Sequence, residues 1–118
     1  MATAFYSVKF SAGNDAGGMG VWAFSEDVGA QEGTMAGADI GGLLYDAQYR
    51  REAGKLIGQC DIDIPAGARL ANGTPVPVAM SYKVPFEIPA DDLTIPFMVR
   101  MPVGGPINVA LRLLKTVP

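Results

Sequence analysis

The chain has no histidine, a single cysteine and no long apolar run, and each absence removes a class of function. Without histidine, a Ser-His-Asp triad, a Cys-His pair and every zinc site that needs imidazole are excluded. A single cysteine, Cys60, excludes an intramolecular disulfide. Because Cys60 falls in the apolar set of an alternating segment, we expect a buried thiol that behaves as a small hydrophobe rather than a reactive one.

Basic residues are also few. Nine Lys and Arg stand against twelve Asp and Glu, which gives a net charge of −3 and argues against direct nucleic-acid binding. No segment has the apolar length needed to cross a membrane, and the first residues lack the basic and apolar regions of a secretory signal. We therefore expect a cytoplasmic protein that does not contact a membrane.

What the sequence does contain is apolar alternation interrupted by turn-forming residues. Fifteen glycines and nine prolines are spread through a chain that is 49% apolar, the pattern expected of many short strands joined by turns. Residues 1–118 are long enough for one domain that folds without disulfides or metal. We predict an all-β fold, an antiparallel barrel of about eight strands, lipocalin-like, with at most one short helix, because closure removes vulnerable sheet edges. An open sandwich is the alternative.

Residues 39–64 carry the strongest pattern, which predicts a long β-hairpin. Apolar and polar side chains alternate along both arms, as in half-buried strands. A turn centred on Ala53-Gly54 sets Ala47 opposite Cys60 and unites the two apolar faces, whereas a one-residue slip would expose them.

Shorter alternating segments precede this hairpin. Residues 5–10 and 19–24 are predicted to pair around a glycine-rich turn at 13–18. The polar stretch 25–33 is predicted to be a surface loop, followed by a short strand at 34–36.

The C-terminal part predicts a long loop, an edge strand and a final hairpin. Residues 65–74 are rich in turn formers, and the prolines within 76–88 indicate an edge or bulged strand because they cannot donate ladder hydrogen bonds. Residues 89–92 are compatible with one helical turn, and a loop at 104–106 predicts the last hairpin. Its predicted pairs are Val103 with Ile107, Met101 with Val109, Val99 with Leu111 and Phe97 with Leu113.

The outer face of the long hairpin gathers charged side chains. The predicted register places Asp46 opposite Asp61, with Asp63 two residues along on the same side, so these like charges repel. Arg50 and Arg51 lie near the hairpin tip. One interpretation is a solvated face screened by water and salt. The functional interpretation is a docking surface for a basic partner, and a hard-cation site is a third, for which too few oxygen ligands converge.

The inner face suggests a different site. Trp22, Tyr45, Tyr49 and Phe97 are predicted to point inward, and a barrel of about eight strands either fills its interior with side chains or holds one small molecule. The alternatives at these four positions are therefore core packing and an apolar ligand cavity.

Three segments resemble the GrlR family of small negative regulators of type III secretion. They are Phe5-Tyr6-Ser7-Val8-Lys9-Phe10, Gly20-Val21-Trp22 and Met35-Ala36-Gly37-Ala38-Asp39-Ile40, followed by a tyrosine-containing long hairpin. The resemblance implies a lipocalin-like barrel that forms a homodimer and represses virulence transcription by holding a transcription activator protein, without enzymatic activity. The family's characterised regulator has alternating Glu and Asp at the hairpin tip, whereas residues 47–52 read AQYRRE, so that activator contact is not transferred.

Together these observations predict a non-enzymatic protein that acts by protein association, without a catalytic residue set, a metal site or a cofactor. The alternative function is a small carrier of an apolar molecule.

Overall fold

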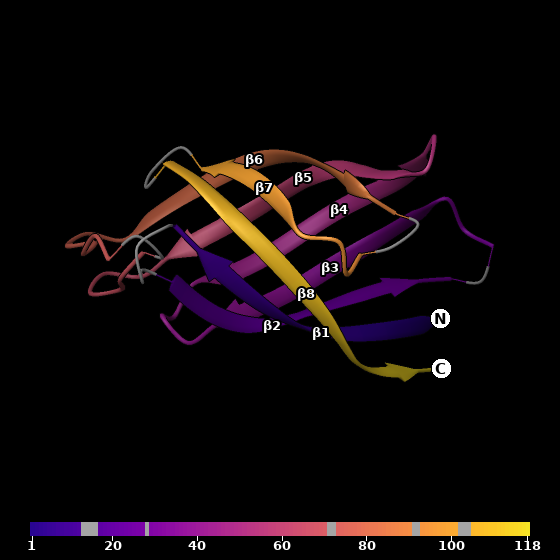
Figure 1. Cartoon of the computed structure of the whole chain (residues 1–118), viewed down its shortest axis with the longest axis horizontal. Coiled ribbons are helices and arrows are strands. Elements are labelled where there is room, and N and C mark those ends of the chain that lie inside the picture. Colours follow the sequence, from indigo (N-terminus) through magenta and orange to yellow (C-terminus); the bar gives the residue numbers. More distant parts are fainter. Residues whose placement is uncertain (13–16, 28, 71–72, 91–92, 102–104) are drawn as a thin grey trace.

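Eight antiparallel strands form a nearly closed barrel in the computed structural model, which describes residues 1–12, 17–27, 29–70, 73–90, 93–101 and 105–118 (Figure 1). The strands are β1 (Ala2–Ser11), β2 (Gly17–Glu26), β3 (Glu32–Asp39), β4 (Leu44–Glu52), β5 (Lys55–Ile64), β6 (Met80–Pro89), β7 (Phe97–Met101) and β8 (Gly105–Val117). No described residue is helical. The predicted all-β antiparallel barrel is therefore confirmed.

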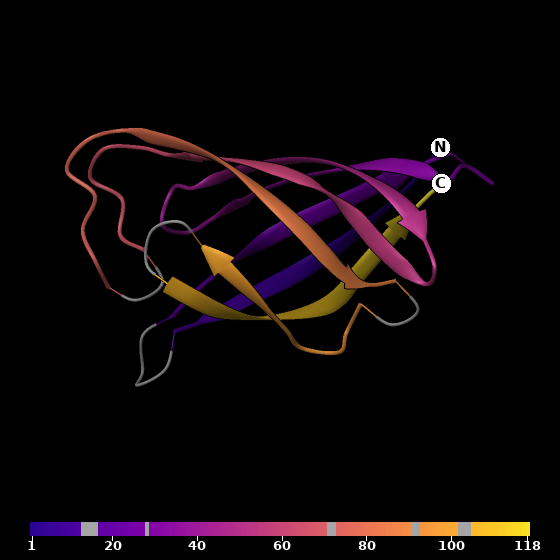
Figure 2. The same ribbon diagram turned by 90° about the horizontal axis from the view of Figure 1, so that it is seen from above.

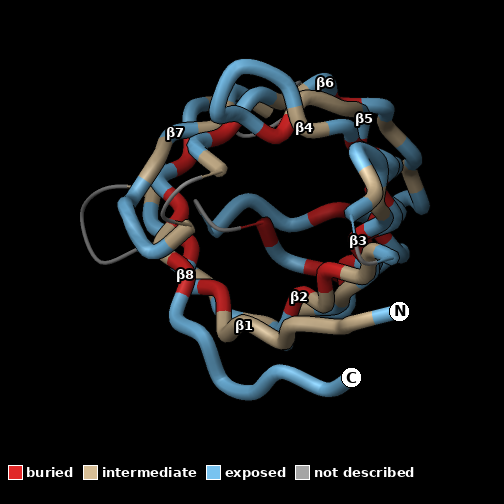
Figure 3. The backbone as a smooth tube through the Cα atoms, turned by 90° about the vertical axis from the view of Figure 1, so that its right-hand side faces the viewer, coloured by how far each residue is buried: buried red, intermediate tan, exposed pale blue. Residues whose placement is uncertain are grey.

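The alternation of apolar and polar residues in the sequence matches the alternation of buried and exposed side chains in the strands. In β4 the buried side chains are Tyr45, Ala47 and Tyr49, and the residues between them are exposed. Strand β5 pairs with β4 in the predicted register, with Ala47 opposite Cys60, and Cys60 is buried. The strands form a ring, and the buried residues of β4 and β5 belong to one core that faces its axis (Figure 3).

The β4–β5 turn has two residues, both in left-handed backbone conformation. The φ angle is 50° at Ala53 and 76° at Gly54. Positive φ at both central positions is the type I′ arrangement, whose twist matches that of the paired strands. This local geometry fixes the register that the hydrophobic pattern requires.

The barrel has a seam between β6 and β7. The sheet order is β6-β5-β4-β3-β2-β1-β8-β7, so these two strands are its edges and are not hydrogen-bonded to each other. They nevertheless lie side by side (Figure 1). The edge position predicted from the prolines of the 76–88 segment is confirmed for β6.

Two N-terminal strands are longer than predicted. Strand β2 continues to Glu26 and β3 begins at Glu32, so both ends of the predicted 25–33 loop belong to these strands. Strand β3 also extends beyond the predicted 34–36 strand, to Asp39. Ser25 pairs with Thr34, and the Ser25 hydroxyl lies 2.9 Å from that of Thr3. The ends of β2 and β3 carry polar side chains on the outer face, so their composition resembles that of a loop. Residues 13–16 of the predicted first turn lie outside the described residues.

The predicted register of the last hairpin is wrong. The observed pairs are Phe97 with Val109, Val99 with Ile107 and Met101 with Gly105. The shift of four positions keeps every side chain on its predicted face, so hydrophobic alternation did not discriminate between the two registers. Residues 102–104, which include part of the predicted loop, lie outside the described residues. In the predicted 89–92 turn, Pro89 is the last residue of β6, and residues 91–92 are not described.

The segment between β5 and β6 folds over one end of the barrel, opposite the end where both termini lie (Figure 2). The long loop predicted at 65–74 is thus confirmed for its described residues, but the next strand begins at Met80 rather than at the predicted Val76. Ala68, Leu70 and Val76 are buried, and the Val76 amide donates to the Ala68 carbonyl at 2.9 Å. The loop therefore contributes apolar side chains to the core.

Candidate ligand-binding cavity

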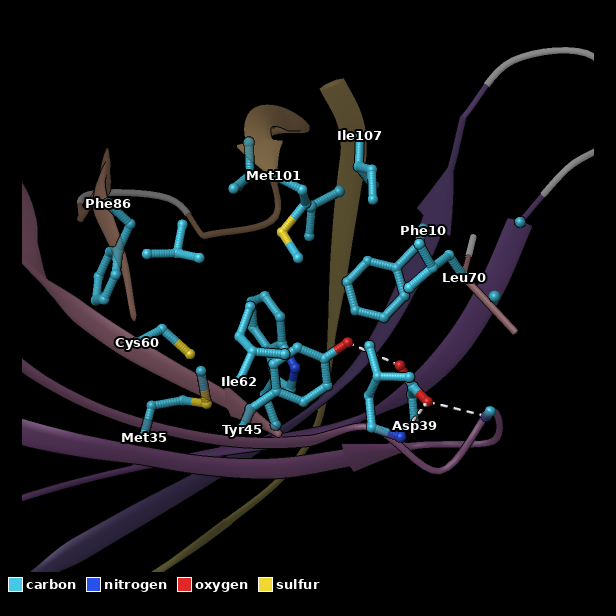
Figure 4. A pocket seen from close by; sticks show the side chains of 18 of the residues that line it. Phe10, Met35, Asp39, Tyr45, Cys60, Ile62, Leu70, Phe86, Met101 and Ile107 are labelled. Carbon is cyan, nitrogen blue, oxygen red and sulfur yellow. Dashed lines mark hydrogen bonds between the residues drawn. The ribbon is translucent and has the colours of Figure 1, made fainter. Parts of the chain in front are cut away.

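The barrel encloses a cavity of about 430 Å³, within the roughly 300–1,000 Å³ range of small-molecule sites. Its lining is mainly apolar and draws on β1 to β8 and on the loop after β5. Figure 4 shows Phe10, Tyr45, Ile62, Phe86 and Met101 around this space.

Three aromatic rings form one wall of the cavity. Trp22 on β2 and Tyr45 on β4 both pair with Gly37 on β3, and their ring centroids are 5.6 Å apart. A Cβ at Gly37 would lie 2.6 Å from Trp22 Cδ1, so the glycine leaves the room that the indole occupies. Phe10 stacks on Tyr45 with centroids 6.0 Å apart. The register of β2, β3 and β4 thus builds a continuous aromatic surface.

Asp39 brings a carboxylate to this wall. Its Oδ1 accepts hydrogen bonds from the amides of Gly41 at 2.9 Å and Leu43 at 3.1 Å, and its Oδ2 accepts one from the Tyr45 hydroxyl at 2.7 Å (Figure 4). Burial, and then the bond to Asp39, raise the pKa of Tyr45, so this hydroxyl stays a donor. Asp39 is half-buried and lines the cavity.

The deeper polar groups have little reactivity. Burial raises the pKa of the Cys60 thiol to about 12, which keeps it protonated at neutral pH and a poor nucleophile. The indole Nε1 of Trp22 is buried without a hydrogen-bond partner. Among the described residues, no group of three or more acidic or thiol side chains is placed to hold a metal ion. The charged side chains among the described lining residues are Asp39 and the exposed Arg69, and most of the remaining lining offers apolar contact.

Three of the four predicted cavity residues line the cavity, namely Trp22, Tyr45 and Phe97. Tyr49 is not among the lining residues, which corrects the prediction for this position. Its ring lies across Gly33 of the neighbouring strand, and its hydroxyl donates to Glu26 Oε2 at 2.8 Å. Glycine at the paired position lets the ring turn along the sheet.

The predicted acidic group lies on the outer face as expected. Asp46 is opposite Asp61, and all three aspartates are exposed. Strand β6 adds two partners that sequence analysis did not assign. Lys83 Nζ lies 3.0 Å from Asp61 Oδ1, and the Ser81 hydroxyl donates to Asp63 Oδ1 at 2.6 Å. The Lys83 charge offsets part of the repulsion.

The two arginines of the predicted docking group diverge. Arg50 is exposed and contacts Glu52 at 2.7 Å. Arg51 has the inward parity of its strand and bonds to Glu26, with Nη2 2.9 Å from Oε1. Arg51 is therefore not brought together with the aspartates.

The sequence did not identify Asp39 as a cavity residue. It also did not identify Glu26 as the partner of Tyr49 and Arg51. Asp39 ends a strand just before Gly41-Gly42, and an Asx side chain before paired glycines is a turn signal that pointed to this carboxylate. Glu26 sat in a segment interpreted as a loop.

No protein-family model, curated protein or solved structure matches this chain. The resemblance to the GrlR family stays a prediction. Among the described residues, no helix has the length and hydropathy to cross a lipid bilayer.

Proposed function

We propose that this protein binds an apolar small molecule inside its barrel, as a lipocalin-like carrier. The observation that carries this proposal is the cavity of about 430 Å³ with its mainly apolar lining. Apolar ligand surface removed from water contributes roughly 25 cal/mol per Å², so a cavity of this kind binds by burial rather than by polar contacts.

A fluorescent apolar probe tests the proposal directly. Trp22 is the only tryptophan and lines the cavity, so energy transfer from it reports a ligand bound there. We expect N-phenylnaphthylamine to quench Trp22 emission in a saturable manner.

A matched pair of variants on β7 locates the bound probe. Val99 lines the cavity, whereas the neighbouring Met98 is 60% exposed on the outer face. Val99→Phe is expected to weaken probe binding by about tenfold, or 1.4 kcal/mol, because the larger ring occupies ligand space. Met98→Phe is expected to change nothing. Equal probe affinity in both folded variants would place the probe elsewhere and contradict the proposal.

Protein association on the outer face is the second candidate, and one observation favours it. Val21, Ala38 and Leu44 form a row across β2, β3 and β4, with Val21 45% and Leu44 51% exposed, and Asp46 and Asp63 adjoin it. An apolar row beside carboxylates fits a basic, partly apolar segment of another protein. A GrlR-like regulatory role, a homodimer and a cytoplasmic location belong to this candidate.

A defined basic peptide of lysine and leucine tests this surface. Replacing Asp46, Asp61 and Asp63 by asparagine is expected to weaken peptide binding severalfold without unfolding the barrel. Removing three exposed carboxylates elsewhere is the control, with Asp27→Asn, Glu32→Gln and Glu52→Gln. If both triple variants lose the same affinity, the peptide responds to net charge alone and the outer face is not the site. Light scattering of the wild type separately measures whether it is a dimer.

A further inference from the structure

We infer that the ligand of the cavity is a hydrophobic organic cation, a protonated amine whose ammonium group binds Asp39 and whose apolar body fills the barrel. This inference rests on the proposed function and specifies its ligand class.

The first step concerns what the interior leaves unpaired. The Tyr45 hydroxyl is engaged by Asp39, and the Cys60 thiol lies 3.7 Å from the Asp61 carbonyl. Trp22 Nε1 has less than 1 Å² of accessible surface, so it offers a ligand almost no area for a hydrogen bond. A ligand body that lies among these residues therefore gains by being apolar, because any polar group it carried there would lose its hydrogen bonds to water.

The second step concerns the charge of Asp39. Its three hydrogen bonds come from two amides and a neutral hydroxyl, and no cationic side chain of the described residues forms an ion pair with it. Two oxygens accept about four hydrogen bonds, so Oδ2 retains capacity for another donor. A half-buried carboxylate without a counter-ion favours a cationic ligand, since a charge-assisted bond is roughly twice as strong as a neutral one.

The third step concerns the rings beside this carboxylate. Phe10 and Tyr45 are stacked, and the Tyr45 hydroxyl bonds to Asp39 itself (Figure 4). Aromatic faces attract ammonium groups, and the combination of rings and a carboxylate is suited to organic cations. A ligand with an anionic group at the same position would be repelled by the Asp39 carboxylate.

Arg69 does not reverse this preference. It lines the cavity from the loop after β5, but it lies between the buried Ala68 and Leu70 and is itself exposed. Its guanidinium donates to the Gly73 carbonyl at 3.5 Å.

Three probes of one shape test the inference by calorimetry, namely phenylbutylamine, phenylbutanol and phenylbutanoate at neutral pH. We expect the amine to bind about tenfold more tightly than the alcohol, equivalent to 1.4 kcal/mol, and the acid to bind most weakly. Asp39→Asn keeps an acceptor for the two amides and is expected to reduce the amine to the affinity of the alcohol. Asp27→Asn removes an exposed carboxylate that belongs to neither proposed site and is expected to leave amine binding unchanged.

The outcomes separate the two proposals. If the alcohol and N-phenylnaphthylamine bind but the amine has no advantage in the wild type, the inference about Asp39 is overturned and the cavity proposal survives. An amine advantage that persists in folded Asp39→Asn overturns it equally. If no probe binds the wild type, the proposed function itself fails. Should Asp39→Asn not fold, the amine-to-alcohol ratio of the wild type at low and high salt decides, because only the ammonium contact weakens with salt.

Discussion

At the scale of single residues, Glu26 holds together the end of the barrel away from the loop after β5. Its carboxylate accepts bonds from Arg51 and from the Tyr49 hydroxyl, and the Glu26 side chain is 29% exposed. Burial alone would raise the pKa of Glu26, but these two hydrogen bonds and the Arg51 charge outweigh burial and hold that pKa below its ordinary value of 4.5. The hydrogen bond between Glu26 and Arg51 raises the pKa of Arg51.

We therefore predict that Glu26→Gln lowers the free energy of unfolding by about 1 kcal/mol at pH 7, a modest figure because both partners are partly solvated. A lowered pKa in the folded state stabilises the fold above pH 4.5, and this contribution is lost as the pH falls through the folded value. Urea unfolding at pH 7 and pH 3 measures this change. The exposed Lys55 and Glu87 pair supplies the control, since Glu87→Gln is expected to have almost no effect. A pH-independent difference between wild type and Glu26→Gln would contradict the prediction.

Sequence pattern located residues well where burial decides their place and poorly where a specific contact does. Cys60, Trp22 and Tyr45 were placed inside because strand alternation leaves them one face. Tyr49 also points inward, but its bond to Glu26 keeps it from the cavity. That bond joins residues 23 positions apart, and no periodic signal encodes it.

At the scale of secondary-structure elements, the β4–β5 turn contains a local conflict. Ala53 adopts a φ of 50°, a conformation that costs an alanine roughly 1 kcal/mol and that asparagine tolerates better. Ala53→Asn is expected to stabilise the protein by about 0.5 kcal/mol, and Ala53→Val to destabilise it, because β-branched residues avoid positive φ. Thermal unfolding of both variants measures the effect, and a shift in the same direction for both would contradict the prediction that positive φ at position 53 costs stability.

Two hairpins show why one register was predictable and the other was not. A slip of one residue between β4 and β5 would turn Ala47 and Cys60 outward, so a single register satisfies the pattern. Between β7 and β8 a slip of four residues leaves both apolar faces intact, and Met101 pairs with Gly105 rather than Val109. The hydrophobic pattern contains no information that separates these two registers.

At the scale of the whole molecule, closure of the sheet was predictable from the number of alternating segments, but the cavity was not. Its volume depends on how Leu70 and the loop around it fold over the barrel end, and on the absence of a side chain at Gly37. The cavity volume therefore depends on a few side-chain volumes, and a pattern of apolar and polar residues does not predict differences of that size.

The seam between β6 and β7 leads to a prediction for the molecule as a whole. In an antiparallel edge strand, alternate amides donate to the neighbouring strand and the others point away from it. In β6 the second set faces the seam, and Pro85 and Pro89 contribute no amide. We expect the seam-facing amides of β6 to exchange with deuterium much faster than any amide in the central strands β3 and β4, because they lack ladder hydrogen bonds.

Ligand binding should change this pattern in a specific way. Phe86 on β6 and Phe97 on β7 both line the cavity, so an occupied cavity gives the two edge strands a shared contact across the seam. We expect phenylbutylamine to slow exchange in β6 and β7 more than in β3, where central position in the sheet already limits opening. The control is Val99→Phe, in which the same ligand concentration should have little effect. Uniform slowing of all strands would mean that the ligand stabilises the fold globally without bridging the seam, and protection confined to the outer-face row would move the binding site out of the barrel.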